Sequence, residues 1–219
     1  MQTALITVAA YLLGSVSFAI LVSRWMGLPD PRAHGSGNPG ATNVLRTGSK
    51  AAAALTLAGD AGKGWVAVML AALISGEPPA LGLAAPLAGL AVFLGHVFPL
   101  YHRFQGGKGV ATAAGVLLAL NPWLGLATLA GWIAIALLFR MSSLAALVSA
   151  LLAPLFAAWM FGPRPIFSVA AAIGTVLIWR HRANIARIAA GTEPRIGAKP
   201  DAGEPEASAA SQDPSADAR

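Results

Sequence analysis

The chain has 219 residues, of which 56% are hydrophobic and 11% are charged, and its mean hydropathy is +0.66. Because an ordinary soluble domain carries about 25% charged residues, this composition excludes a soluble globular protein. The net charge is +6, and without residues 199 to 219 it is +9, from 13 basic and 4 acidic residues. A basic, apolar body is typical of a membrane protein with cationic loops or an anion site. It lacks the aromatic and basic soluble face of a nucleic-acid-binding protein, and the absence of cysteine excludes disulfides and thiolate chemistry.

Apolar segments long enough to cross a bilayer recur along the chain, since one helical span needs about 20 residues. The first 23 residues carry no charge, unlike the positive start of a signal peptide, and we interpret them as a retained span. The expected single spans are residues 3–23, 51–75, 81–101, 141–160 and 165–179.

Residues 110–139 form a charge-free stretch of thirty residues, too long for one span and interrupted by an Asn-Pro turn signal at 121–122. A single span would place Arg140 across the membrane from Arg103 and Lys108, whereas two spans keep these cations together. Because cationic loops collect on the cytoplasmic side, the sequence favours two spans.

The sequence therefore predicts an all-α, polytopic membrane protein with about seven transmembrane helices, its N-terminus outside and its C-terminus inside. The segment Val110–Leu120 is short for a span, since at 1.5 Å per residue it covers about half of a roughly 30 Å hydrocarbon core. We expect residues 1–197 to form the membrane-embedded domain. Residues 198–219, rich in Ala, Ser, Pro, Asp and Glu, are predicted to be a disordered cytoplasmic tail.

The first of three polar segments runs from Gly35 to Arg46 and reads GSGNPGATNVLR. Glycines let backbone N–H groups converge on one anion, and the planar guanidinium of Arg46 suits a phosphate. The alternative is a turn-rich loop whose Asn-Pro-Gly only reverses the chain. The candidate contacts here are Ser36, Gly37, Asn38, Thr42, Asn43 and Arg46.

The second segment, from His96 to Thr112, contains Gly-Gly-Lys-Gly directly before a predicted helix. Such a turn presents free N–H groups and the positive end of the helix dipole. It does not match the nucleotide P-loop, which needs Gly-x-x-x-x-Gly-Lys followed by Ser or Thr. Although a snorkelling lysine in a flexible loop would look alike, we favour a phosphate site at Gly106, Gly107, Lys108 and Gly109.

The third segment, WRHRANIAR, continues the last span. His181 and Asn184 are three residues apart and share a helix face. Arg180, Arg182 and Arg187 are interpreted as anchors for anionic lipid.

Two smaller features complete the polar inventory. Asp60 and Lys63 lie three apart inside the second span and are predicted to form a structural ion pair. Ser142 and Ser143 either cap a helix or present a hydroxyl to the site.

These three segments, GSGNPGATNVLR, GHVFP with FQGGKGVAT, and HRANIARIAAGTEPRIG, resemble in order and spacing those of the acyl-phosphate-dependent glycerol-3-phosphate acyltransferases of bacterial membranes. The resemblance covers about residues 1 to 197. Two positions depart from it, Gln105 where a basic residue is usual and Ala183 where an acidic one is usual.

The resemblance implies a seven-span enzyme of the cytoplasmic (inner) membrane with its site at the cytoplasmic face. It would move a fatty acyl group from acyl phosphate to the 1-hydroxyl of glycerol 3-phosphate, the first acylation of phospholipid biosynthesis, with no metal, no cofactor and no acyl-CoA. An acyl-phosphate-producing enzyme would be its functional neighbour. By family pattern Ser36, Arg46, Lys108, His181 and Asn184 act on the substrates, Ser143 lies near the pocket, and Glu193 holds the fold.

The chemistry requires two anions to be held together while a hydroxyl meets the acyl carbon. The proton acceptor is either His181 or a substrate phosphate oxygen, and our hypothesis is that His181 orients phosphate more than it deprotonates. The alternative function is a transporter of phosphorylated solutes, which would need a binding site at the bilayer midplane, where Asp60 and Lys63 are nearly the sole polar residues.

Overall fold

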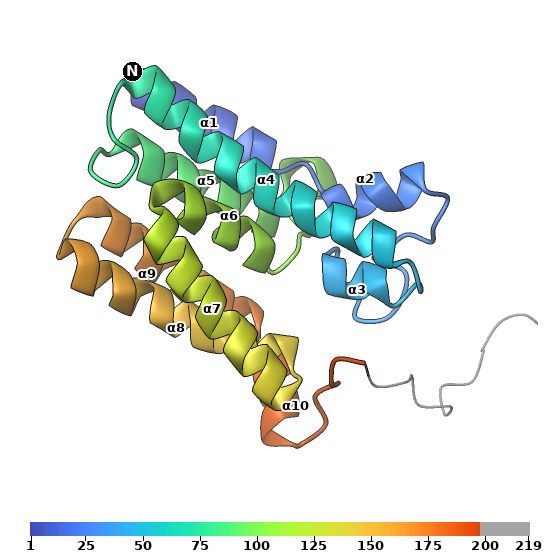
Figure 1. Cartoon of the computed structure of the whole chain (residues 1–219). Helices are drawn as coiled ribbons and strands as arrows, with labels where there is room; N and C mark the ends of the chain where they lie inside the picture. The colour runs from blue at the N-terminus through green and yellow to red at the C-terminus, as the bar shows by residue number, and fades with distance from the viewer. Residues whose placement is uncertain (198–219) are drawn as a thin grey trace, which may run out of the picture.

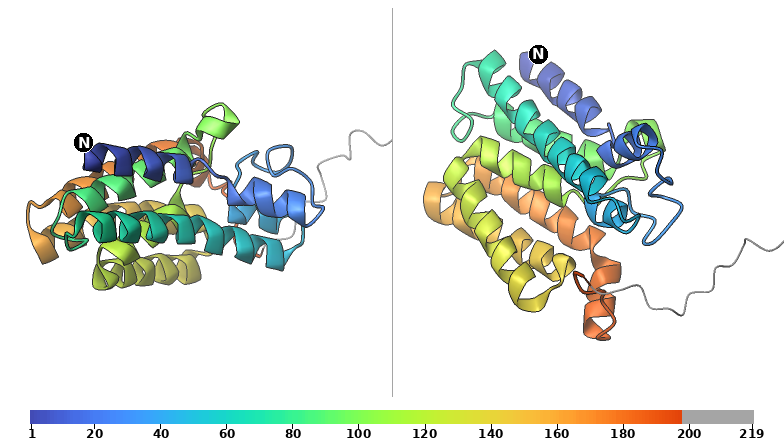
Figure 2. Two further views of the ribbon diagram at one scale, coloured as in Figure 1. Left: turned by 90° about the horizontal axis from the view of Figure 1, so that it is seen from above. Right: turned by 45° about the vertical axis from the view of Figure 1, so that its right-hand side comes forward.

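The computed structural model describes residues 1–197, which form helices and no strand. The tail predicted at 198–219 lies outside the described residues. The long helices lie side by side in one bundle (Figure 1, Figure 2). In chain order the elements are α1 (Gln2–Gly14), α2 (Phe18–Trp25), α3 (Ala41–Leu45), α4 (Lys50–Ser75), α5 (Ala84–Val97), the 3-10 turn η1 (Leu100–His102), α6 (Val110–Leu120), α7 (Pro122–Phe139), α8 (Ser142–Phe161), α9 (Pro165–Arg180) and α10 (Arg182–Ala189).

Several helices have the length and composition of membrane spans. Four segments within the described residues qualify alone, namely α4, α7, α8 and the α5–η1 segment, and α1 with α2 could form a fifth. Helices α6 and α9 are apolar but shorter, with 11 and 16 residues. The all-helical, membrane-spanning character predicted from composition is confirmed at this coarser level.

The continuous helix predicted at 3–23 is wrong, because the chain breaks after Gly14 and bends by 41° into α2. Two contacts with other segments hold the chain at the break, and one of them satisfies a backbone carbonyl. Ser15 Oγ accepts from the amide of Leu100 at 3.1 Å, and Lys63 Nζ donates to the carbonyl of Val16 at 2.7 Å. In an apolar surrounding, backbone groups can leave a helix only where such partners exist.

The stretch 110–139 consists of two helices, as predicted. Asn121 ends α6 and begins α7 in an extended conformation, φ −157°. Its Oδ1 accepts from the amide of Leu124 at 3.0 Å, and Pro122 occupies the first helical position. A capping side chain followed by proline is a strong helix start, so this turn separates the two helices.

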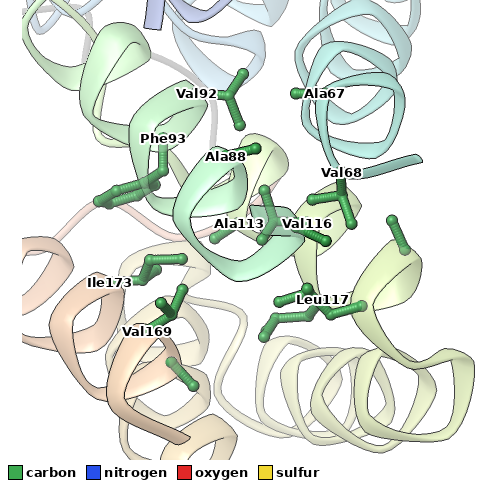
Figure 3. Close-up of a cluster of buried hydrophobic side chains, with 14 of the residues drawn as sticks. Ala67, Val68, Ala88, Val92, Phe93, Ala113, Val116, Leu117, Val169 and Ile173 are labelled. Atoms are coloured by element: carbon green, nitrogen blue, oxygen red, sulfur yellow. The ribbon is translucent and has the colours of Figure 1, made fainter. Parts of the chain in front are cut away.

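The interior lies where α4, α5, α6 and α9 meet, and Figure 3 shows their small and branched side chains interlocking. Glycine permits this close approach at several positions. A Cβ on Gly115 of α6 would overlap the backbone of Ala61 in α4, and one on Gly174 of α9 would lie 2.5 Å from the Ala150 carbonyl of α8. Small residues at such crossings are typical of membrane helix bundles.

The two ends of the bundle differ in chemistry. The N-terminus, the α4–α5 loop and the α8–α9 turn lie at one end, and α2, α3 and α10 lie at the other (Figure 1, Figure 2). All three polar motifs belong to this second end, because they include α3, the start of α6 and α10. The candidate site is therefore assembled at one end of the bundle.

Candidate active site

The first motif folds around the buried side chain of Asn43 in α3. Asn43 Nδ2 donates to the carbonyls of Pro31 at 2.5 Å and His34 at 3.1 Å. Its Oδ1 accepts from the amide of Ser36 at 3.1 Å and from Arg46 Nη1 at 3.3 Å. Both amide donors are thus used inside the loop. Asn43, predicted as a phosphate contact, instead holds the loop in shape.

The remaining side chains of this motif are available to a ligand. Ser36, Thr42 and Arg46 are exposed, and Asn38 is half-buried. Gly35 has φ +56°, and a Cβ there would overlap Asn43 Oδ1. This glycine is therefore required for the loop to close, and the loop presents a hydroxyl and a guanidinium at its surface.

The second motif is buried against both of the others. The carbonyl of Gly106 accepts from Arg180 Nη2 at 2.7 Å, and the amide of Gly107 donates to the carbonyl of His96 at 3.2 Å. A Cβ on Gly107 would lie 3.0 Å from the Pro39 carbonyl, tighter than an ordinary contact. The glycine loop therefore touches the first motif through Pro39 and the third through Arg180.

Gly109 forms the N-cap of α6 with φ +85°, and a Cβ there would overlap the ring of Phe93. The predicted arrangement of a glycine turn opening a helix is confirmed, since α6 begins at Val110. Free N–H groups of the first helical turn thus lie next to Lys108.

The third motif meets the second through a chain of hydrogen bonds. Lys108 Nζ donates to Asn184 Oδ1 at 2.5 Å, and Asn184 Nδ2 donates to Glu193 Oε1 at 2.7 Å. Arg187 Nε donates to the other oxygen of Glu193 at 2.8 Å. The buried hydroxyl of Ser143 lies near this carboxylate without a hydrogen-bond partner among residues 1–197. The structure thus brings together Lys108, Asn184 and Ser143, which were expected in or near the site, and Glu193, which was expected to hold the fold.

The electrostatics around Lys108 show what this network can bind. Burial lowers the pKa of Lys108 to about 8, against the opposing charge of Glu193. The positive charges of Arg187, Arg180 and Arg46 also lower it. One carboxylate therefore faces four cations, and an anion such as a phosphate would relieve their mutual repulsion.

Glu193 stays ionised in this setting. Burial alone would raise its pKa, but the donors around it, including Asn184 and Arg187, hold the pKa below its usual value. Its two oxygens accept from these two side chains, which is consistent with the structural role expected for it. Within residues 1–197 no three His, Asp or Glu side chains converge as metal ligands would.

His181 is buried at the end of α9, and its Nδ1 lies 2.8 Å from the carbonyl of Leu177. Since a carbonyl can only accept, this contact assigns the ring proton to Nδ1 and leaves Nε2 as an acceptor. Burial lowers the pKa of His181 to about 4, so the ring is neutral near pH 7. A neutral ring with a free acceptor suits a hydroxyl donor better than a phosphate oxygen.

Sequence reasoning missed the inward roles of two arginines. Arg180 and Arg187 were interpreted as lipid anchors, but they bind the Gly106 carbonyl and Glu193. Arg182 keeps the surface role, with its guanidinium 5.0 Å from the ring of Trp179. The signal for Arg187 was its spacing, because Asn184 and Arg187 are three residues apart on α10. Arg180 lies on α9, before the turn at His181.

Comparisons with known proteins agree with the motif pattern. Residues 4–191 match the family model described as glycerol-3-phosphate acyltransferase. Glycerol-3-phosphate acyltransferases of Ralstonia nicotianae and Burkholderia thailandensis are 60% and 61% identical to the chain. The alignments cover 90% and 91% of this chain and 95% and 98% of those proteins.

Two crystal structures share the fold. Both are of PlsY, an integral membrane glycerol 3-phosphate acyltransferase, in its glycerol 3-phosphate and lysophosphatidic acid forms. Their TM-scores are 0.84 and 0.82 at 37% and 36% identity, over 90% of this chain and 96% of theirs. By its motifs, its fold and these relatives, the chain belongs to the glycerol-3-phosphate acyltransferase family of integral membrane enzymes.

Proposed function

We propose that this acyltransferase takes its acyl group from acyl phosphate and transfers it to the 1-hydroxyl of sn-glycerol 3-phosphate. The hydroxyl oxygen bonds to the acyl carbon, the bond from that carbon to the bridging phosphate oxygen breaks, and inorganic phosphate leaves. The product is 1-acylglycerol 3-phosphate. The observation that carries this proposal is the convergence of Lys108, Arg46, Arg180 and Arg187 around two glycine motifs, because both substrates are phosphates.

Lys108 and Arg46 would bind the substrate phosphates, with N–H groups of Gly106, Gly109 and the first turn of α6. The amide of Gly107 donates to the carbonyl of His96, so Gly107 would shape this loop. Asn184 orients Lys108, since its Oδ1 accepts from Nζ. The exposed hydroxyl of Ser36 would add a donor at the surface of the site, and the buried hydroxyl of Ser143 would add one from the interior. Fixed cations near the bridging oxygen would stabilise the charge that develops on the leaving phosphate.

The proton acceptor follows from relative basicity. His181 has a pKa of about 4, whereas the second ionisation of a phosphate monoester lies near 6. The lowered pKa makes His181 a weaker base than an ordinary imidazole and favours a substrate phosphate oxygen as the base. We propose that this oxygen takes the proton, while His181 Nε2 accepts from a substrate hydroxyl and orients it. This replaces our expectation that His181 orients phosphate.

The membrane orientation is also part of the proposal. Residues 1–197 would cross the bacterial inner membrane seven times, with α1 and α2 as one broken span, the N-terminus outside and the site at the cytoplasmic face. The concentration of cations at the α3 and α10 end supports this orientation. The chain has no cysteine, so single cysteines placed at Thr47 and Arg164 can be labelled in intact cells. Labelling at 164 and protection at 47 supports it, and the reverse pattern contradicts it.

The donor is tested with the purified chain in detergent. Palmitoyl phosphate, palmitoyl-CoA and palmitoyl-acyl carrier protein are each offered with labelled glycerol 3-phosphate, with and without EDTA. We expect product from palmitoyl phosphate alone, unaffected by EDTA, which would place the enzyme after one that makes acyl phosphate. Product only from a thioester refutes the donor. Uptake of glycerol 3-phosphate into proteoliposomes without acylated product would favour the transporter.

A further inference from the structure

A buried polar cluster of Asp60, Lys63 and His96 lies beside the site and has no part in the mechanism above. Lys63 Nζ is 2.9 Å from Asp60 Oδ1, 3.0 Å from His96 Nδ1 and 2.7 Å from the Val16 carbonyl. The three side chains are 1% to 6% exposed. The expected contact between Asp60 and Lys63 is present, but sequence reasoning did not include His96 in it.

The cluster compensates the charge of Lys63 inside the bundle. Lys63 Nζ donates to the carbonyl of Val16, forms an ion pair with Asp60 and lies within hydrogen-bond distance of His96 Nδ1. His96 Nδ1 lies 3.0 Å from Lys63 Nζ and 3.3 Å from Asp60 Oδ1, so this edge of the ring faces the ion pair. The Nε2 edge of the ring is directed at Gly107.

Gly107 fits against His96 so closely that no side chain can replace its hydrogen. A Cβ there would overlap Nε2 and lie 3.0 Å from Cε1 of the ring. The amide of Gly107 also binds the carbonyl of His96 at 3.2 Å. The φ of Gly107 is not positive, so contact with the ring, and not backbone strain, requires glycine here.

We propose that Asp60, Lys63 and His96 are positioning residues. Through the contact of His96 with Gly107 they fix where the Gly106–Lys108 loop lies, and so fix the position of Lys108 in the phosphate site. Lys63 contacts both His96 and the carbonyl of Val16 at the α1–α2 break. The ring edge of His96 packs against Gly107 of the loop. The proposal rests on the proposed role of this loop in phosphate binding. It explains a charged cluster inside the bundle, where ionisable groups are costly and pair with one another.

A double-mutant cycle tests the contact. His96→Asn keeps an acceptor near the Nδ1 position but removes the two ring atoms that face Gly107, whereas His96→Gln retains an amide near Nε2. Each is combined with Gly107→Ala in the full chain. Initial rates with palmitoyl phosphate and glycerol 3-phosphate give kcat and KM, and Tm is measured in the same detergent.

We expect His96→Asn and Gly107→Ala each to lower kcat/KM about tenfold or more, through KM for glycerol 3-phosphate more than through kcat. In the His96→Asn background Gly107→Ala costs little more, because the overlap with the ring is removed and the remaining 3.0 Å approach to the Pro39 carbonyl needs only a small shift. In the His96→Gln background Gly107→Ala stays harmful. Gly174→Ala, a packing glycine against Ala150, is the matched control. In the double mutant, the factors by which Gly174→Ala and His96→Asn each change kcat/KM should multiply.

Independent effects of His96→Asn and Gly107→Ala would overturn the proposal, and so would a His96→Asn protein with wild-type kinetics. A His96→Asn protein that fails to fold would assign the cluster to stability alone and also overturn it. Wild-type activity is measured first. If the wild type shows no activity with palmitoyl phosphate, the proposed donor is refuted, and the cycle is then run with the donor that the wild type accepts. The proposed donor and the proposed positioning role can therefore fail independently.

Discussion

Replacing Lys108 by Met removes the amine that joins the glycine loop to Asn184 and, in our account, to a substrate phosphate. Truncating one partner of a buried, hydrogen-bonded charge pair costs about 2–5 kcal/mol. At about 1.4 kcal/mol per factor of ten, Lys108→Met should lower kcat/KM roughly 30-fold to several thousandfold.

The same substitution should not destabilise the protein. The pKa of Lys108 is lowered by burial from its ordinary value of 10.5 to about 8. A lysine whose pKa is lower in the folded than in the unfolded protein reduces the free energy of unfolding while it is protonated. This reduction disappears only as the pH rises from about 8 towards 10.5. Methionine fills similar volume without a charge, so the Tm at pH 7 should equal or exceed that of the wild type.

The assay combines initial rates across both substrate concentrations with Tm in the same detergent. Leu117→Met, a buried substitution in α6 away from the site, is the matched control and should leave kcat/KM within about twofold. If Lys108→Met lost activity only in parallel with a fall in Tm, Lys108 would be a folding residue and the reasoning would be refuted.

Three further predictions follow from the same geometry. In the free enzyme kcat/KM should fall above about pH 8 as Lys108 loses its proton, and in Lys108→Arg this limb should disappear because guanidinium stays charged; an unmoved limb assigns it elsewhere. Glu193→Gln should lower Tm by about 3–10 °C through loss of charge-assisted bonds from Asn184 and Arg187, and an unchanged Tm would contradict the role given to it. Asn121→Ala should lower Tm by about 2–4 °C with unchanged kcat/KM, since it removes the N-cap of α7 far from the site; a loss of activity there would place the site at the wrong end.

Hydropathy predicted most of the helices, because long apolar runs have few folded solutions in a membrane. Helix α4 was expected at 51–75 and occupies Lys50–Ser75, and α8 was expected at 141–160 and occupies Ser142–Phe161. The break between α1 and α2 was not predictable in this way. It involves two residues distant in sequence: Lys63 donates to the carbonyl of Val16, and the amide of Leu100 donates to the side chain of Ser15.

The site was predicted to a similar depth. Residue types and spacing pointed to Lys108 and Asn184, and the family resemblance implied a structural role for Glu193. The fold joins these three residues in one network. Residue types and spacing could not show that the side-chain amide of Asn43 donates both its hydrogen bonds within its own loop, because this depends on where the carbonyls of Pro31 and His34 lie.

The reaction itself is tested most directly by following the bridging oxygen. Palmitoyl phosphate made from fully 18O-labelled phosphate is given to the purified chain with glycerol 3-phosphate. The account predicts one inorganic phosphate for each 1-acylglycerol 3-phosphate, with all four 18O atoms in the phosphate, because attack at the acyl carbon leaves the bridging oxygen on phosphorus. Release of 18O-labelled palmitate without acylated product would mean attack at phosphorus, and would contradict acyl transfer at this site.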